Sequence, residues 1–282
     1  MTSLAPPPQH PERPEQPAAP SGRRAWPPWG GVVAVVAAIV LSLLGSLAVA
    51  IFASLGGVEV FEEGRDTPPG VLVAGAFVQG VVFVGVAIGF ARLSGPAYAR
   101  DFGLRATPFW RSVGITIGLY LAFVMATALW WSLVGNPGDE RLLESLGIDR
   151  NTVLLVLGAL TVCVVAPLGE EFLFRGFLYP SLRNGLGIAW AAVVTGVIFG
   201  LLHGLSSAPE NLLPLAALGA ALCLIYQATG SLYPCIALHA INNAIALATN
   251  EDWDWQVIPP LALGAVAVCL GAGAVAGRLW RP

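Results

Sequence analysis

The stretch ALTVCVVAPLGEEFLFRGFLYPSLR, residues 159–183, places two glutamates and an arginine inside an otherwise apolar run. A helix needs about 20 apolar residues to cross a bilayer, and this run is long enough. A charge at membrane depth costs about 2.5–3.5 kcal/mol on insertion scales, so charges there mark functional sites. We therefore expect a membrane helix that carries part of a functional site at Glu170, Glu171 and Arg175.

The composition of the whole chain agrees with a lipid environment. Of the 282 residues, 56% are hydrophobic and only 11% are charged, and the mean hydropathy is +0.74. Soluble domains carry roughly 25% charged residues, so a water-facing surface of the usual kind is excluded. The net charge of −3 is too small to indicate nucleic acid as a partner. The four cysteines show neither paired spacing nor a secreted disulfide pattern, so we interpret them as small apolar residues.

Apolar runs of spanning length recur along the chain, which predicts an all-α bundle of about eight transmembrane helices. Before the first run, segment 1–29 is rich in proline and has no apolar period, so we predict a disordered cytoplasmic tail there. Segment 30–149 holds the N-terminal transmembrane helices. The eight runs are 31–54, 70–91, 112–134, 152–178, 188–205, 212–229, 231–249 and 258–277.

The arginines predict an orientation. The chain has no lysine, so all 14 basic residues are arginine. If the N-terminus is cytoplasmic, all of them except Arg65, Arg141 and Arg150 fall on cytoplasmic segments. The positive-inside rule therefore predicts that both termini lie in the cytoplasm. Arginine-only basic usage and the proline-rich tail look bacterial, so we expect a multi-pass protein of a bacterial cell membrane.

Two later apolar runs also carry polar residues. The run AAVVTGVIFGLLHG, residues 191–204, contains His203. The run LYPCIALHAINNAIALATN, residues 232–250, contains His239, Asn242 and Asn243. A helical rise of 1.5 Å per residue places these side chains and Glu170 near the middle of the bilayer. We expect them to converge on one intramembrane cavity that is reached from the cytoplasmic side.

Helical phase separates the two glutamates. Glu171 and Arg175 are four residues apart and share a face in the favourable acid-before-base order. Glu170 is turned by about 100° from Glu171, so it is predicted to face the cavity. The same spacing places His239 beside Asn243, and it places Phe199 beside His203.

This set of residues suits hydrolysis. A buried carboxylate near a histidine can take a proton from water, and a His–Asn pair can supply donors for the resulting oxyanion. Asn242 is interpreted as a supporting residue. Two alternatives remain open: Glu171 and Arg175 can form a purely structural ion pair, and the triad Glu170, His203 and His239 can bind zinc with one position open to water. The H-E-x-x-H motif that would favour zinc is absent from the sequence.

Three motifs occur in order: E-E-x-x-x-R at Glu170, Glu171 and Arg175, F-x-x-x-H ending at His203, and H-x-x-x-N from His239 to Asn243. Together they resemble the CPBP family of CAAX proteases and bacteriocin-processing enzymes, also called the Abi family, and in particular the type 2 CAAX prenyl proteases. The resemblance covers about residues 150–250. By this resemblance 150–250 is the protease core. The last apolar run predicts that 251–282 is a C-terminal transmembrane helix.

The resemblance implies an eight-helix bundle with a conical cavity open to the cytoplasm, and an intramembrane endopeptidase. Its substrate is a membrane-associated protein or peptide. Glu170 would activate the attacking water with help from His203. His239 and Asn243 would form the oxyanion hole. The supporting residues by this reading are Glu171, Arg175, Phe199 and Asn242. No cofactor is certain, and zinc stays possible.

Two other functions share these features. A bacteriocin-immunity or regulatory membrane protein would keep the same fold but act by binding alone. A transporter would use the polar cluster as a proton or substrate site. Transporters often show matching broken helices in their two halves. Here the intramembrane polar residues are confined to the second half, which disfavours a transporter.

Overall fold

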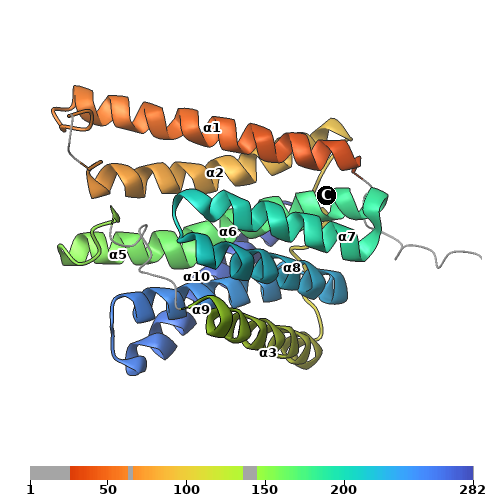
Figure 1. Cartoon of the computed structure of the whole chain (residues 1–282). Helices are drawn as coiled ribbons and strands as arrows, with labels where there is room; N and C mark the ends of the chain where they lie inside the picture. The colour runs from red at the N-terminus through yellow and green to blue at the C-terminus, as the bar shows by residue number, and fades with distance from the viewer. Residues whose placement is uncertain (1–25, 63–65, 136–144, 282) are drawn as a thin grey trace, which may run out of the picture.

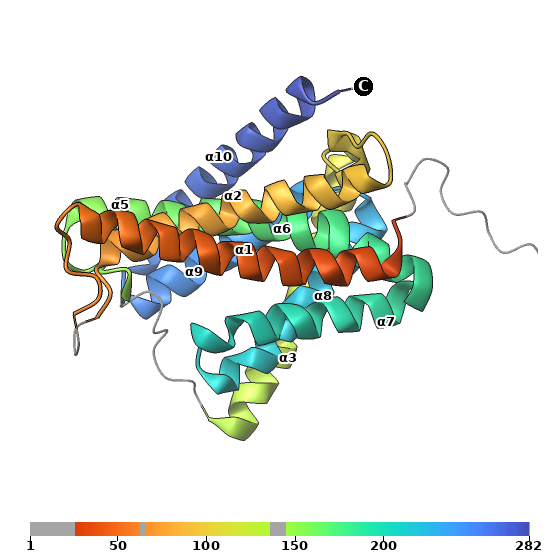
Figure 2. The ribbon, with the colours of Figure 1, turned by 90° about the horizontal axis from the view of Figure 1, so that it is seen from above.

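The computed structural model describes residues 26–62, 66–135 and 145–281. All regular structure in these ranges is helical, which confirms the predicted all-α class. Figure 1 shows α1 and α2 side by side along one face of the bundle, α3 along the opposite face and α6 between them. In the view of Figure 2, α10 runs at an angle to α1 and α2. The longer helices are α1 (Pro28–Leu55), α2 (Pro69–Leu93), α3 (Phe109–Val134), α7 (Tyr179–Leu202), α8 (Leu212–Thr229), α9 (Tyr233–Asn250) and α10 (Ile258–Leu279).

The remaining helical segments are short. The fourth predicted run, 152–178, is built from α5 (Thr152–Leu160), the π-helical turn η2 (Thr161–Val165), α6 (Ala166–Leu173) and a second π-helical turn, η3 (Phe174–Leu178). Short 3₁₀ turns flank the longer helices. They are η1 (Ala99–Phe102), η4 (His203–Leu205), η5 (Pro209–Asn211) and η6 (Trp255–Val257).

The fourth and fifth predicted spans meet at Gly187. Its φ of 76° and ψ of 177° interrupt the helical geometry of α7, a conformation that glycine adopts without steric cost. In the described part of the chain, six helical segments are long and apolar enough to cross a membrane, with 152–202 taken as one of them. α9 is not among the six because His239, Asn242 and Asn243 lower its hydropathy. The chain is a multi-pass integral membrane protein.

The start of the first helix corrects the boundary predicted for the tail. α1 begins at Pro28, inside the segment 1–29 that was predicted to be disordered. Trp26, just before this helix, is 2% exposed and packs its ring against Phe177 at 4.9 Å and Phe102 at 5.3 Å. The rest of the predicted tail, 1–25, lies outside the described residues.

The contact between α7 and α8 is close enough to require glycine. A Cβ atom at Gly200 would lie 2.6 Å from the backbone oxygen of Leu212, and one at Gly196 would meet the backbone oxygen of Ala216. Glycines four residues apart let membrane helices approach closely. The close packing of α7 against α8 fixes the C-terminal end of α7, and His203 is the residue that directly follows this end.

We expect Gly200→Ala to destabilise the protein, because the added methyl group collides with backbone that cannot move aside. Overpacking of this kind costs about 1–3 kcal/mol. Gly118→Ala in α3 is the matched control, since nothing lies within 4 Å of its Cβ position. Helix propensity alone predicts that this control variant is more stable than the wild type by up to about 1 kcal/mol in the free energy of unfolding. Thermal unfolding in detergent measures both variants, and equal stability would show that α7 and α8 pack more loosely.

Candidate active site

The predicted pair of Glu171 and Arg175 is present at the centre of the bundle. Arg175 Nη1 donates a hydrogen bond to Glu171 Oε1 at 2.8 Å, and both side chains are 0% exposed. Arg175 Nη2 donates to the backbone oxygen of Gly219 at 2.8 Å, and the guanidinium lies 4.7 Å from the ring centroid of Phe199. Arg175 therefore ties α6, α7 and α8 together. It had been counted among the cytoplasmic arginines, and its burial removes it from that count.

His239 lies between the two glutamates. Its Nδ1 is 2.8 Å from Glu171 Oε1, and its Nε2 is 3.8 Å from Glu170 Oε2. The ring is 3% exposed. Because an ionised carboxylate only accepts hydrogen bonds, Nδ1 carries the proton. The orientation of His239 is therefore set by the same carboxylate that holds Arg175.

Glu170 differs from Glu171 as helical phase predicts. Its side chain is 12% exposed, and its Oε2 has no hydrogen-bond partner among the described residues. A buried carboxylate oxygen without a donor is costly, so such an atom in a folded protein calls for an explanation. The side chain as a whole keeps 12% of its surface exposed, and a partly exposed carboxylate beside a histidine is placed to take a proton from water.

Asn243 is positioned by a backbone oxygen that the sequence analysis did not single out. In the π-helical turn η2, Ala166 donates its N–H to Thr161 O instead of to Val162 O. The next residue, Pro167, has no N–H to give to Val162 O. Asn243 Nδ2 donates to that oxygen at 2.9 Å, and the amide keeps a second N–H. The turn η3 also ends two residues before a proline, Pro180, so proline placement was the signal available in the sequence.

His203 is placed through Phe199 and not through Glu170. Its Nδ1 lies 2.8 Å from Phe199 O, and since a carbonyl only accepts, Nδ1–H is the donor. Nε2 of the neutral ring is then free to accept. The Phe199 ring centroid is 4.6 Å from that of His203 and 5.8 Å from that of His239, so it separates the two histidines. Within the described ranges no hydrogen bond or ion pair joins His203 to Glu170, and their cooperation stays a prediction.

Asn242 points toward α3. Its Oδ1 accepts a hydrogen bond from Tyr120 Oη at 3.4 Å. This contact joins α9 to α3 on a different side from Asn243. A supporting role for Asn242 thus rests on holding α9 in place.

In the zinc alternative, the metal ligands are Glu170, His203 and His239. Among the residues that the structure describes, no three His, Cys, Asp or Glu side chains are grouped so as to hold a metal ion. The arrangement therefore does not fit a three-residue metal site, and we derive no step through a metal.

A cavity around these residues stays a prediction, and the cavity that stands out in the structure lies elsewhere. A cavity of about 1080 Å³ lies against α9, and its lining contains none of the residues predicted to be catalytic. It is lined by Leu238 and Ile241, whereas His239 turns toward α6. α9 therefore carries the motif residues on one side and this cavity on another.

These features define a polytopic membrane protein with a buried Glu–Arg–His network and a partly exposed glutamate beside it. Residues 152–245, about a third of the chain, match the Rce1-like family, described as type II CAAX prenyl endopeptidase Rce1-like. The match confirms the resemblance predicted from the three motifs: this segment is similar to the CAAX prenyl endopeptidases. No curated protein and no solved structure matches the chain.

Proposed function

We propose that the protein cleaves a peptide bond of a membrane-associated protein or peptide, using a water molecule activated by Glu170. The observation that supports this most directly is the unpartnered Oε2 of Glu170, 3.8 Å from His239 Nε2. The neighbouring Glu171 binds Arg175 and His239 through Oε1, and its Oε2 is also unpartnered among the described residues. Glu171 is 0% exposed and Glu170 is 12% exposed, so Glu170 is the member of the pair that water can reach.

In the proposed reaction, Glu170 takes a proton from water as the water oxygen bonds to the substrate carbonyl carbon. The carbonyl oxygen becomes an oxyanion, which the remaining N–H of Asn243 and, in its protonated form, the Nε2–H of His239 stabilise. The C–N bond then breaks, and the proton on Glu170 passes to the leaving amine. Glu170 is regenerated as a carboxylate. His203 accepts a hydrogen bond from the attacking water through Nε2.

The location of the protein in the membrane and its orientation there are part of the same proposal. Both termini lie in the cytoplasm, and the substrate reaches the site from that side of a bacterial cell membrane. The support is the distribution of arginines in the sequence, from which the buried Arg175 is now removed. Five of these arginines lie outside the described residues: Arg13, Arg23, Arg24, Arg65 and Arg141. The acidic ends of the helices, such as Glu251 and Asp252 after α9, then face the opposite side.

The proposal is tested by cleavage of a lipid-anchored reporter peptide by the purified protein in vesicles. We expect the wild type to cleave and His203→Ala to lose about 10²–10⁴-fold in rate, the range for loss of a general acid–base group. His10→Ala is the matched control and should cleave at the wild-type rate. A chelator should have no effect; loss of activity that zinc restores would favour the metal alternative. A wild type that cleaves no reporter, while site variants still lose a cellular phenotype, would favour a binding protein.

A further inference from the structure

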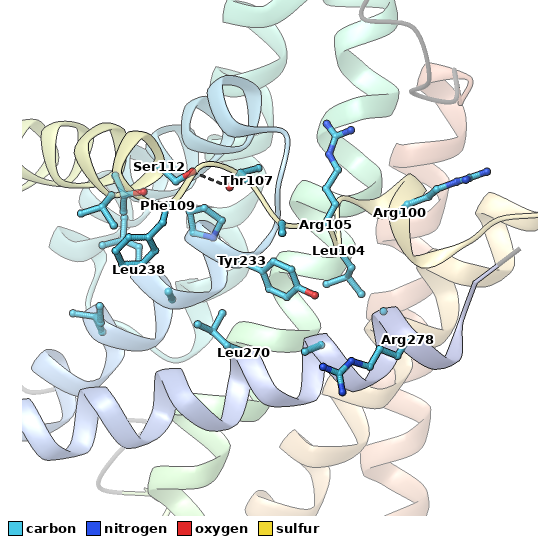
Figure 3. Close-up of a pocket in the computed structure, with 18 of the residues that line it drawn as sticks. Arg100, Leu104, Arg105, Thr107, Phe109, Ser112, Tyr233, Leu238, Leu270 and Arg278 are labelled. Atoms are coloured by element: carbon cyan, nitrogen blue, oxygen red, sulfur yellow. Dashed lines mark hydrogen bonds between the residues drawn. The ribbon is translucent and has the colours of Figure 1, made fainter.

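A large cavity lies between α3, α9 and α10, and the segment before α3 contributes Arg100 and residues 104–107 to its lining (Figure 3). Its volume is about 1080 Å³. α9 contacts both α3 and α10, so the cavity lies along the face of α9 between these two helices. Its walls are apolar over most of their length, with Val113, Ile117, Leu238, Ile241, Leu270 and Ala274.

One end of this cavity is basic. Four arginines line it, and no Asp or Glu of the described residues does: Arg100, Arg105, Arg278 and Arg281. Figure 3 shows Arg100, Arg105 and Arg278 around one end, with Phe109 and Leu238 toward the other. The carboxylate of Asp101 lies 4.0 Å from Arg100 Nε but outside the lining. The cavity therefore combines a positive end with an apolar body.

The arginines keep donors available for a ligand. Arg105 uses Nε to bind the backbone oxygen of Gly230 at 2.7 Å, and Arg281 uses Nε to bind that of Gly277 at 3.3 Å. Each guanidinium has five N–H donors in a planar fork that matches the oxygens of a phosphate group. The terminal nitrogens of both side chains are thus left for an anion. Arg100 and Arg278 are exposed.

We propose that this cavity binds an anionic phospholipid, with the headgroup phosphate at the arginines and the acyl chains along the apolar walls. Basic pockets between transmembrane helices bind acidic lipid headgroups in this way. The arginine-rich end of the bundle is the end predicted to be cytoplasmic, where anionic lipids are abundant. The site is separate from the motif residues, because His239 leaves α9 toward Glu171 and away from the cavity. The proposal therefore does not depend on peptidase activity.

Native mass spectrometry of the full-length protein in detergent tests this site, with phosphatidylglycerol and phosphatidylcholine of equal chain length as probes. We expect tighter binding of phosphatidylglycerol. Each arginine near a phosphate contributes about fivefold in affinity, so the double variant Arg100→Gln, Arg278→Gln should lose about 25-fold for phosphatidylglycerol and little for phosphatidylcholine. The matched control is Arg92→Gln, Arg111→Gln, two exposed arginines outside the lining, which should bind as the wild type does.

A third variant tests the apolar part of the site. Ala274→Trp fills the body of the cavity without changing its charge, so it should weaken the binding of both lipids. The proposal is overturned if the two lipids bind equally to the wild type, if the arginine double variant keeps its affinity for phosphatidylglycerol, or if Ala274→Trp changes neither affinity.

Discussion

Replacing Arg175 with methionine is expected to destabilise the protein by about 3–5 kcal/mol, the cost of leaving a buried charge without its partner. Glu171 is 0% exposed, and without Arg175 it keeps, among the described residues, only the hydrogen bond to His239. The backbone oxygen of Gly219 and the face of Phe199 lose the guanidinium as well. Because these contacts join α6, α7 and α8, we expect the whole bundle to unfold at lower temperature in detergent.

Two further variants separate the charge from the side chain itself. Arg111→Met removes an exposed arginine of α3 and should change stability by no more than about 0.5 kcal/mol. Adding Glu171→Gln to Arg175→Met removes the stranded carboxylate, so the double variant should recover part of the loss. If Arg175→Met is as stable as Arg111→Met, the pair does not hold the bundle together, and its burial needs another explanation.

Replacing Glu170 with glutamine is expected to have the largest effect on activity. The amide has nearly the same shape but cannot take a proton from water, so cleavage should fall by at least about 10³-fold. Stability should change little, because Oε2 of Glu170 has no hydrogen bond to lose among the described residues. The reporter assay measures the rate, and thermal unfolding measures the stability of the same preparation.

The control for this variant is Glu210→Gln, the same chemical change at the turn before α8. It should leave the rate within about threefold of the wild type, as is usual for surface changes remote from a site. Residual cleavage by Glu170→Gln close to the wild-type rate would remove Glu170 from the mechanism. Cleavage lost together with folding would instead assign Glu170 a structural role, and the two readouts distinguish these results.

Helix positions and the pairing of Glu171 with Arg175 followed from the sequence because both depend on local spacing. Apolar length predicts where a helix can cross lipid, and the spacing of four residues predicts which side chains share a face. The predicted run 152–178 matches the observed helical segment from α5 to η3. The three motifs likewise predicted the family that residues 152–245 match.

Only the tertiary structure decided which partners those faces meet. His239 is four residues from Asn243, yet it binds Glu171 of another helix, while Asn243 binds the oxygen that Pro167 leaves without a donor. Such contacts join residues 68 and 81 positions apart, and helical period carries no information across that separation. The burial of Trp26 and the arginine-lined cavity beside α9 have the same cause, since each depends on how separate helices pack. The sequence by itself determined a membrane bundle with a polar centre; packing decided which atoms of that centre are committed and left Glu170 Oε2 unpartnered.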